Sequence, residues 1–129
     1  MTPEEIARLI CSSYSYRAAV QASSRMTLEW DPTTAPEAVT DGDLANKWLA
    51  AADDRRPWLQ VDLGRSVPVD RAVITWHRDD GRVGYTLETS NDGLLWQAAA
   101  VVAPECYASN RQDLRFASRA ARLVRVRVT

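Results

Sequence analysis

The feature that most constrains the fold is a two-residue alternation of apolar and polar side chains. Leu59, Val61 and Leu63 alternate with Trp58, Gln60 and Asp62, and the same period recurs near residues 71–76, 85–90, 96–102 and 124–128. Successive side chains of an extended chain point to opposite faces, so this period indicates strands with one buried face. A weaker form of the pattern predicts further strands near residues 17–23 and 112–117.

Turn-forming residues separate these runs. They fall at Gly64 to Pro68, at Asp79-Asp80-Gly81 and at Asn91-Asp92-Gly93. In the fourth run, the alternation predicts one shared face for Trp96, Ala98, Ala100 and Val102. Many short strands with turns between them, and no second long helical pattern, predict an all-β antiparallel sandwich or barrel.

The N-terminal residues carry a different pattern. Thr2 and Glu5 form a capping box with Pro3 at the first helical position, and Ile6, Leu9 and Ile10 then lie on one face. We therefore expect a short N-terminal helix within a segment of residues 1–16. The sandwich domain then occupies residues 17–129.

Composition narrows the class of protein. The 129 residues suit one domain, and a net charge of -1 supplies no basic field for nucleic acid or anionic membrane. The apolar runs are too short to span a bilayer, and the acidic N-terminus is not a secretion signal. The chain is then either cytoplasmic or a piece of a longer protein. Cys11 and Cys106 fit either two buried thiols or one disulfide in an exported chain.

Few residues are available for catalysis. His77 is the only histidine, so a zinc motif cannot be built, and no Gly-x-Ser-x-Gly nucleophile turn occurs. Asp53-Asp54 and Asp79-Asp80 are adjacent carboxylates, but neighbouring residues on a loop usually point apart and are better explained as solvated turn acids. We predict that the chain is not an enzyme.

Residues 24–57 form a long stretch with little regular pattern, which is typical of a functional loop. Within it, Asp41, Asp43 and Asn46 offer side-chain oxygens suited to Ca²⁺, and Gly42 permits a tight turn. The helix-loop-helix calcium loop is excluded because position 52 is Ala52. The alternative is an Asp-Gly turn that is merely acidic.

An ordered set of residues resembles discoidin domains, also called coagulation factor 5/8 type C domains, and is similar to family 32 carbohydrate-binding modules. The resemblance covers roughly residues 17–129. It implies a galactose-binding-domain-like fold, a jelly-roll sandwich with ligands bound at loops on one end. The matching residues are Ala22-Ser23-Ser24, Pro36 to Asp43, Trp48, Pro57 to Gly64, Tyr85, Ser90 to Gly93, Trp96 and Ala121 to Val126.

The resemblance also implies a structural calcium ion. Its ligands would be Asp41, Asp43, Asn46 and the carbonyl of Ala38. The family usually adds a last strand whose glutamate closes the site, whereas this sequence stops at Thr129, where the penultimate strand would end. We therefore expect an open, weak or empty metal site. We also expect an unpaired sheet edge through which the chain could self-associate.

A ligand site follows from the same resemblance. Arg78 matches an arginine that binds sugar hydroxyls, whereas the usual histidine and glutamate partners are replaced by Leu49 and Arg25. Galactose specificity is therefore not expected. His77 and Asp79 would be secondary polar contacts. Two aromatic residues are candidate stacking platforms, with packing over the sandwich end as their alternative role: Trp30 and Tyr107.

We expect a non-catalytic carbohydrate-binding module, part of or partner to a larger carbohydrate-active protein that is exported to the extracellular space. The alternative is a protein-interaction or assembly module, or less favourably a lipid-binding one that would use Met26, Leu28 and Trp30. Arg125 and Arg127 share a strand face, which would suit an anion-binding stripe or charges that deter edge aggregation.

Overall fold

The computed structural model describes residues 14, 18–25, 40, 48–51, 53–76, 84–103 and 111–129. The predicted N-terminal helix, Cys11 and Cys106 lie outside these residues. No helix with the length and hydropathy of a membrane span occurs in the described part of the chain.

Five strands make up one antiparallel sheet in the described residues. Their order across the sheet is β1-β2-β5-β3-β4, and each neighbouring pair is antiparallel. This confirms the predicted all-β antiparallel class, and the two weaker strand predictions as well. The strands are β1 (Ala19–Ala22), β2 (Trp58–Thr75), β3 (Tyr85–Ser90), β4 (Gln97–Val102) and β5 (Arg111–Val128).

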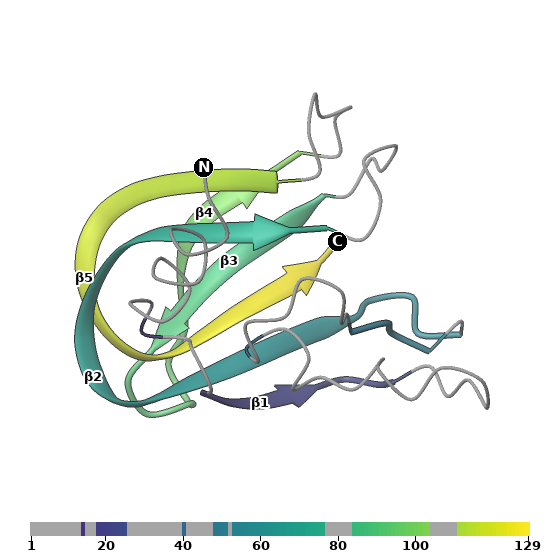
Figure 1. The fold of residues 1–129 in the computed structure, drawn as a ribbon, viewed down its shortest axis with the longest axis horizontal. Coiled ribbons are helices and arrows are strands. Elements are labelled where there is room, and N and C mark those ends of the chain that lie inside the picture. The colour runs from purple at the N-terminus through teal and green to yellow at the C-terminus, as the bar shows by residue number, and fades with distance from the viewer. Residues whose placement is uncertain are drawn as a thin grey trace, which may run out of the picture.

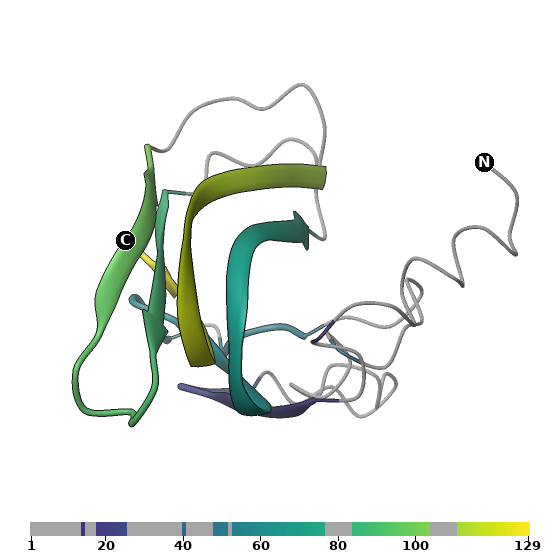
Figure 2. The ribbon, with the colours of Figure 1, turned by 90° about the vertical axis from the view of Figure 1, so that its left-hand side faces the viewer.

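Strands β2 and β5 are each 18 residues long and bend together, so that each belongs to both layers of the sandwich (Figure 1). Figure 2 shows the two strands curving as a pair, with β1 beside β2 and with β3 and β4 beyond β5. The first half of β2 pairs with the last part of β5, whereas Arg71 to Thr75 pair with Arg115 to Arg111. The paired bend folds the sheet over on itself.

The turn predicted at Gly64 to Pro68 is wrong. These residues belong to β2, and the pairing with β5 shifts register between Asp62 and Val67 and again between Val69 and Arg71. Gly64 has a φ of 84°, a left-handed conformation that glycine adopts without the penalty of a Cβ atom. The register with β5 skips residues 63–66 and resumes at Val67, so the turn residues form a bulge that bends a strand which keeps the same partner on both sides.

The core lies on the inner face of the sheet. Leu59, Tyr85 and Leu87 are buried there, as the alternation predicted. The Tyr85 ring packs against the Trp76 ring with centroids 5.1 Å apart. The side-chain oxygen of Gln112 accepts hydrogen bonds from the Tyr85 hydroxyl and from Trp76 Nε1, the latter at 3.1 Å. These bonds tie β3 to the end of β2 and the start of β5, which belong to the other layer.

The prediction of a shared face for four residues from 96 to 102 is wrong. Ala98 pairs with Glu88 and Ala100 pairs with Leu87, and these two β3 neighbours point to opposite faces. The register shift between them leaves Ala99 as an extra residue in β4. The bulge reverses the alternation, so Ala98 lies on the outer face and Ala100 on the inner face.

We predict that Gln112→Leu lowers the free energy of unfolding by about 2 kcal/mol, because Tyr85 and Trp76 both lose their shared acceptor. Tyr85→Phe should cost about 1 kcal/mol, since Gln112 keeps its bond to Trp76. Urea unfolding followed by tryptophan fluorescence measures both. Equal losses in the two variants would contradict the shared-acceptor interpretation.

Candidate functional site

One end of the sandwich gathers the ends of many strands; we call it the loop end. Ser23 N–H donates to the Trp58 carbonyl and Thr129 N–H donates to the Gly84 carbonyl, each at 2.9 Å. Tyr85 pairs with both Val102 and Val128, so β4 and β5 also end there. Figure 1 shows the bends of β2 and β5 at the opposite end, on the left.

The contacts of Trp76 and Gln112 with Tyr85 bring the end of β2 and the start of β5 to the same end. The described residues that flank three segments of the chain therefore all belong to the loop end. The segments are 26–47, 77–83 and 104–110.

Asp54 joins the end of β1 to the start of β2. Its Oδ2 atom accepts hydrogen bonds from the hydroxyls of Ser23 at 2.6 Å and Ser24 at 2.5 Å. Each hydroxyl oxygen also accepts a backbone N–H, Ser23 from Trp58 at 2.9 Å and Ser24 from Ala51 at 3.0 Å. Both serines thus donate and accept, and Asp54 orients them.

Two further bonds fix the described residues on either side of the predicted metal loop. Thr40, which directly precedes Asp41, is buried, and its Oγ1 donates to the Ala18 carbonyl at 3.0 Å. Trp48 is half-buried, and its Nε1 donates to the Ser24 carbonyl at 2.9 Å. The chain is therefore held against β1 on both sides of the loop.

The same hydrogen bonds perturb the Asp54 carboxyl. The Ser23 hydroxyl, then the Ser24 hydroxyl and the Arg56 N–H, hold the pKa of Asp54 below its usual value of 3.8 by stabilising the charged form. Its contribution to stability is present above the ordinary pKa and is lost as the pH falls through the lowered one.

The sequence pattern at Asp53-Asp54 indicates only solvated turn acids, whereas in the structure Asp54 binds two serine hydroxyls. Its partners lie 30 and 31 residues away in the sequence. No local spacing reports such a contact, and only the Ala-Ser-Ser sequence at the end of β1 hints at it.

The predicted ligand residues lie outside the described residues. They are Arg78, Trp30, His77, Asp79 and Tyr107, together with the predicted metal ligands Asp41, Asp43, Asn46 and Ala38. Among the described residues, no group of three or more His, Cys, Asp and Glu side chains is placed to hold a metal ion. The two residues that replace the usual galactose contacts lie among the described residues. Arg25 is exposed and Leu49 is half-buried.

Arg125 and Arg127 lie on the outer face, and the prediction that they share a face is confirmed. Both guanidinium groups bind the carboxylate of Glu88, at 3.0 Å and 2.8 Å. The Arg125 guanidinium also stacks 3.9 Å from the centroid of the Trp96 ring. Glu88 therefore neutralises one of the two positive charges.

The bent antiparallel sheet, whose strand ends gather at the loop end, has the architecture of the galactose-binding-domain-like jelly roll. The NedA-like, galactose-binding domain model of the F5/8 type C group matches residues 38–126, and the chain belongs to this family. This confirms the resemblance to discoidin domains.

Solved structures agree with this assignment. Chitosan-binding module 1 of a chitosanase/glucanase from Paenibacillus sp. IK-5 is 25% identical, with a TM-score of 0.77, over 90% of this chain and 85% of that one. Module 2 of that enzyme, solved with chitotriose, is 23% identical, with a TM-score of 0.79, over 91% and 87%.

A more distant match has the same fold. CpGH89CBM32-5 from Clostridium perfringens, solved with GalNAc-β-1,3-galactose, is 17% identical, with a TM-score of 0.71, over 87% of this chain and 84% of that one. No curated protein sequence matches the chain.

We predict that Asp54→Ala speeds hydrogen exchange at the amides of Ala51 and Trp58 by about tenfold, because the serine acceptors lose their orientation. The Tyr85 amide should be unchanged. Asp53→Ala is the matched control. In the parent protein the same two amides should lose protection as the pH falls below about 4, since protonated Asp54 binds the serines less well. Equal exchange in both variants would contradict this role.

Proposed function

We propose that this domain is a non-catalytic carbohydrate-binding module that holds an oligosaccharide at the loop end of the sandwich. The observation that carries the proposal is the family match over residues 38–126, joined to solved neighbours that are carbohydrate-binding modules. The fold supports it as well, because the described residues that flank three segments of the chain gather at one end of the sandwich. Binding sites are commonly built from loops on such a scaffold.

Arg78 is the principal ligand contact in this proposal. It follows Trp76 by two residues, and the Trp76 ring is held by Tyr85 and Gln112. The five N–H donors of Arg78 suit sugar hydroxyls. His77 and Asp79 would add polar contacts, with Trp30 or Tyr107 as the stacking surface.

We infer that the ligand is an amino-sugar oligosaccharide and not a terminal galactose. Arg25 and Leu49 replace two usual galactose contacts. The loop-end sequence is also acidic. Residues 23–57 hold seven acidic and four basic residues, residues 76–84 hold two of each, and residues 103–110 hold one acidic residue. An excess of acidic side chains favours the ammonium groups of glucosamine polymers, and the 25% identical neighbour is a chitosan-binding module.

A structural calcium ion fits the donor chemistry of the loop that follows Thr40. Two carboxylates, a side-chain amide and a carbonyl are the hard oxygens that Ca²⁺ prefers. The buried Thr40 hydroxyl, bonded to Ala18, fixes the residue just before Asp41. Asp41, Asp43, Asn46 and the Ala38 carbonyl would hold the ion, which would order the loop and take no part in chemistry.

In a longer protein, the module would serve a catalytic domain by keeping it near its substrate, which raises the local substrate concentration. Such a protein acts on glycans outside the cell. The domain itself would contribute affinity and no reaction step.

One observation favours a second role in protein assembly. Leu94 and Leu95 at the turn between β3 and β4 are 83% and 78% exposed. Both of their N–H groups donate to Asp92 Oδ1, which holds the turn in one shape. This apolar tip lies away from the loop end, so it would contact a neighbouring domain without blocking a glycan.

We predict that Arg78→Ala abolishes binding of a glucosamine hexamer in isothermal titration calorimetry. The melting temperature should shift by less than about 1 °C, because the proposal gives Arg78 a role in ligand binding and none in packing. Arg65→Ala, an exposed arginine on the bend of β2, is the matched control and should bind as the parent does. If Arg78→Ala binds the hexamer with unchanged affinity, Arg78 is not a ligand contact and the site lies elsewhere.

We predict that 1 mM Ca²⁺ raises the melting temperature by about 5 °C relative to chelator, which corresponds to a Kd of about 0.1 mM. Differential scanning fluorimetry measures the shift. Asp41→Asn combined with Asp43→Asn should remove the dependence on calcium. A calcium-dependent shift that survives in this double variant would place the ion at other ligands.

A further inference from the structure

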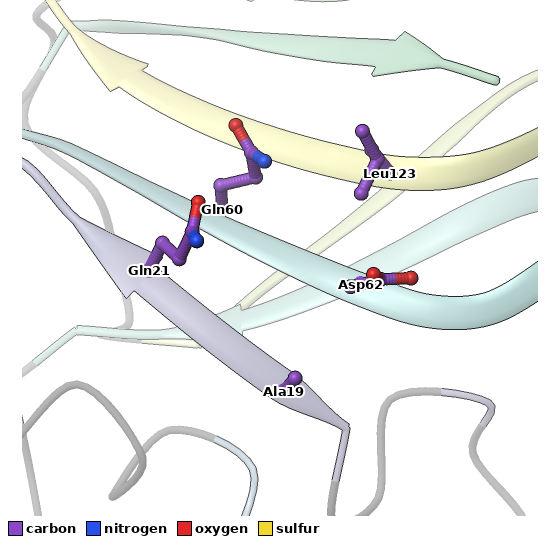
Figure 3. A pocket seen from close by; sticks show the side chains of 5 residues that line it. All are labelled: Ala19, Gln21, Gln60, Asp62 and Leu123. Atoms are coloured by element: carbon purple, nitrogen blue, oxygen red, sulfur yellow. The ribbon is translucent and has the colours of Figure 1, made fainter. Parts of the chain in front are cut away.

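The outer face of the sheet carries a polar groove that the proposed loop-end site does not use. A pocket of about 90 Å³ lies over β1, β2 and β5, lined by Ala19, Gln21, Gln60, Asp62 and Leu123. Figure 3 shows Gln21 and Gln60 projecting on the same side of their two strands, with Leu123 beyond them on β5. The small Ala19 side chain, which pairs with Asp62, leaves space beside the carboxylate.

The two glutamines are available to a ligand. They are direct cross-strand partners, so their Cβ atoms are about 5 Å apart. No hydrogen bond within the described part of the chain uses either side-chain amide. Gln21 is exposed and Gln60 is partly exposed. Each amide offers two donors and one acceptor oxygen, which matches a hydroxyl pair that both donates and accepts.

Asp62 supplies a fixed acceptor beside the amides. Its Oδ1 accepts hydrogen bonds from Gly64 N–H at 2.8 Å and from Arg122 Nε at 3.0 Å, and its Oδ2 accepts from Arg122 Nη2 at 3.2 Å. These bonds hold the carboxylate in one orientation and neutralise it. An oxygen of Asp62 still has lone-pair capacity for a ligand hydroxyl.

The charge around the groove selects the ligand class. The glutamines are neutral, and the nearest carboxylate is paired with Arg122. On the other side, Arg125 pairs with both Gln60 and Glu88 in register, and Glu88 binds its guanidinium. A cationic sugar therefore gains little, whereas an uncharged hydroxyl-rich ring can use two amides, one fixed carboxylate and the apolar surface of Leu123.

We propose that this groove is a second glycan subsite, on the sheet face, for an uncharged oligosaccharide. Strand register places Gln60 two residues from the loop-end residue Trp58, a rise of about 7 Å, so the subsite lies near the loop end but is built from strands. This subsite rests on the proposed function in one respect, that the ligand is a carbohydrate. It does not depend on where the loop-end site lies.

The test is a ¹H–¹⁵N NMR titration with cellohexaose, a neutral probe. The side-chain amide signals of Gln21 and Gln60 and the backbone signals of Asp62 and Leu123 should shift. Gln21→Ala combined with Gln60→Ala should weaken the Asp62 and Leu123 response by about tenfold or more. The control Gln97→Ala, an exposed glutamine on β4, should respond as the parent does. Gln21→Ala alone, at an exposed position, guards against a folding defect in the double variant.

Arg78→Ala separates this proposal from the proposed function. If the groove signals of Arg78→Ala still shift with cellohexaose while glucosamine-hexamer binding is lost, both proposals stand. If the groove signals of the parent protein do not shift although the loop-end site binds, the sheet-face subsite is overturned alone. Groove shifts that persist undiminished in the double glutamine variant also overturn it. If Arg78→Ala leaves the binding of both glycans unchanged while the double glutamine variant loses the groove response, the loop-end site fails and the groove stands.

Discussion

The structure depends on the antiparallel pairing of β2 with β5 through their common bend. Each strand runs for 18 residues, and the two remain partners on both sides of the bend. A bent single strand would expose unpaired N–H and C=O groups, which is costly inside a fold. Because both strands bend together, most of these groups keep their partners. The same bend turns one sheet into two layers that enclose Tyr85 and Leu87.

That arrangement places the bends of the sheet and the proposed ligand site at opposite ends of the sandwich. The bends and the β3–β4 turn lie at one end, and the segments around residues 26–47, 77–83 and 104–110 start and finish at the other. Polar bonds then fix the loop end. Asp54 orients Ser23 and Ser24, and the indole of Trp48 binds the backbone of Ser24. A module of this kind can vary its ligand by changing loops, because the sheet that supports them does not depend on their sequence.

The outer face of the sheet is polar but largely self-satisfied. Glu88 binds two arginines, and Asp62 binds Arg122 and the Gly64 backbone. Gln21 and Gln60 differ from these residues, since they are cross-strand partners on β1 and β2 whose amides make no hydrogen bond in the described chain. A polar ligand can bind these amide groups without first breaking a hydrogen bond within the protein. The free-energy cost of binding is therefore low at this pocket.

Much of the fold followed from the period-two pattern and its turn residues. The inner face of β2 and β3 was predicted from Leu59, Tyr85 and their neighbours, and the turn at Asn91 to Gly93 is confirmed by the bonds of Ser90 and Asp92. The pattern failed where a glycine or an extra residue changed the direction of the strand. Gly64 bends β2 without ending it, and Ala99 reverses the faces of β4. Turn propensity depends on the conformations open to a few residues. It does not indicate whether a neighbouring strand bends along with them and stays paired.

The sequence by itself determined the all-β class, the inner face of most strands and the family resemblance, because alternation and turn chemistry act over a few residues. Tertiary structure alone decided which distant groups meet. Gln112 joins Tyr85 and Trp76, Asp54 joins two serines about thirty residues away, and Gln21 comes to lie beside Gln60. Those contacts depend on strand register and on the bend of β2 with β5, and no sequence spacing encodes either of them.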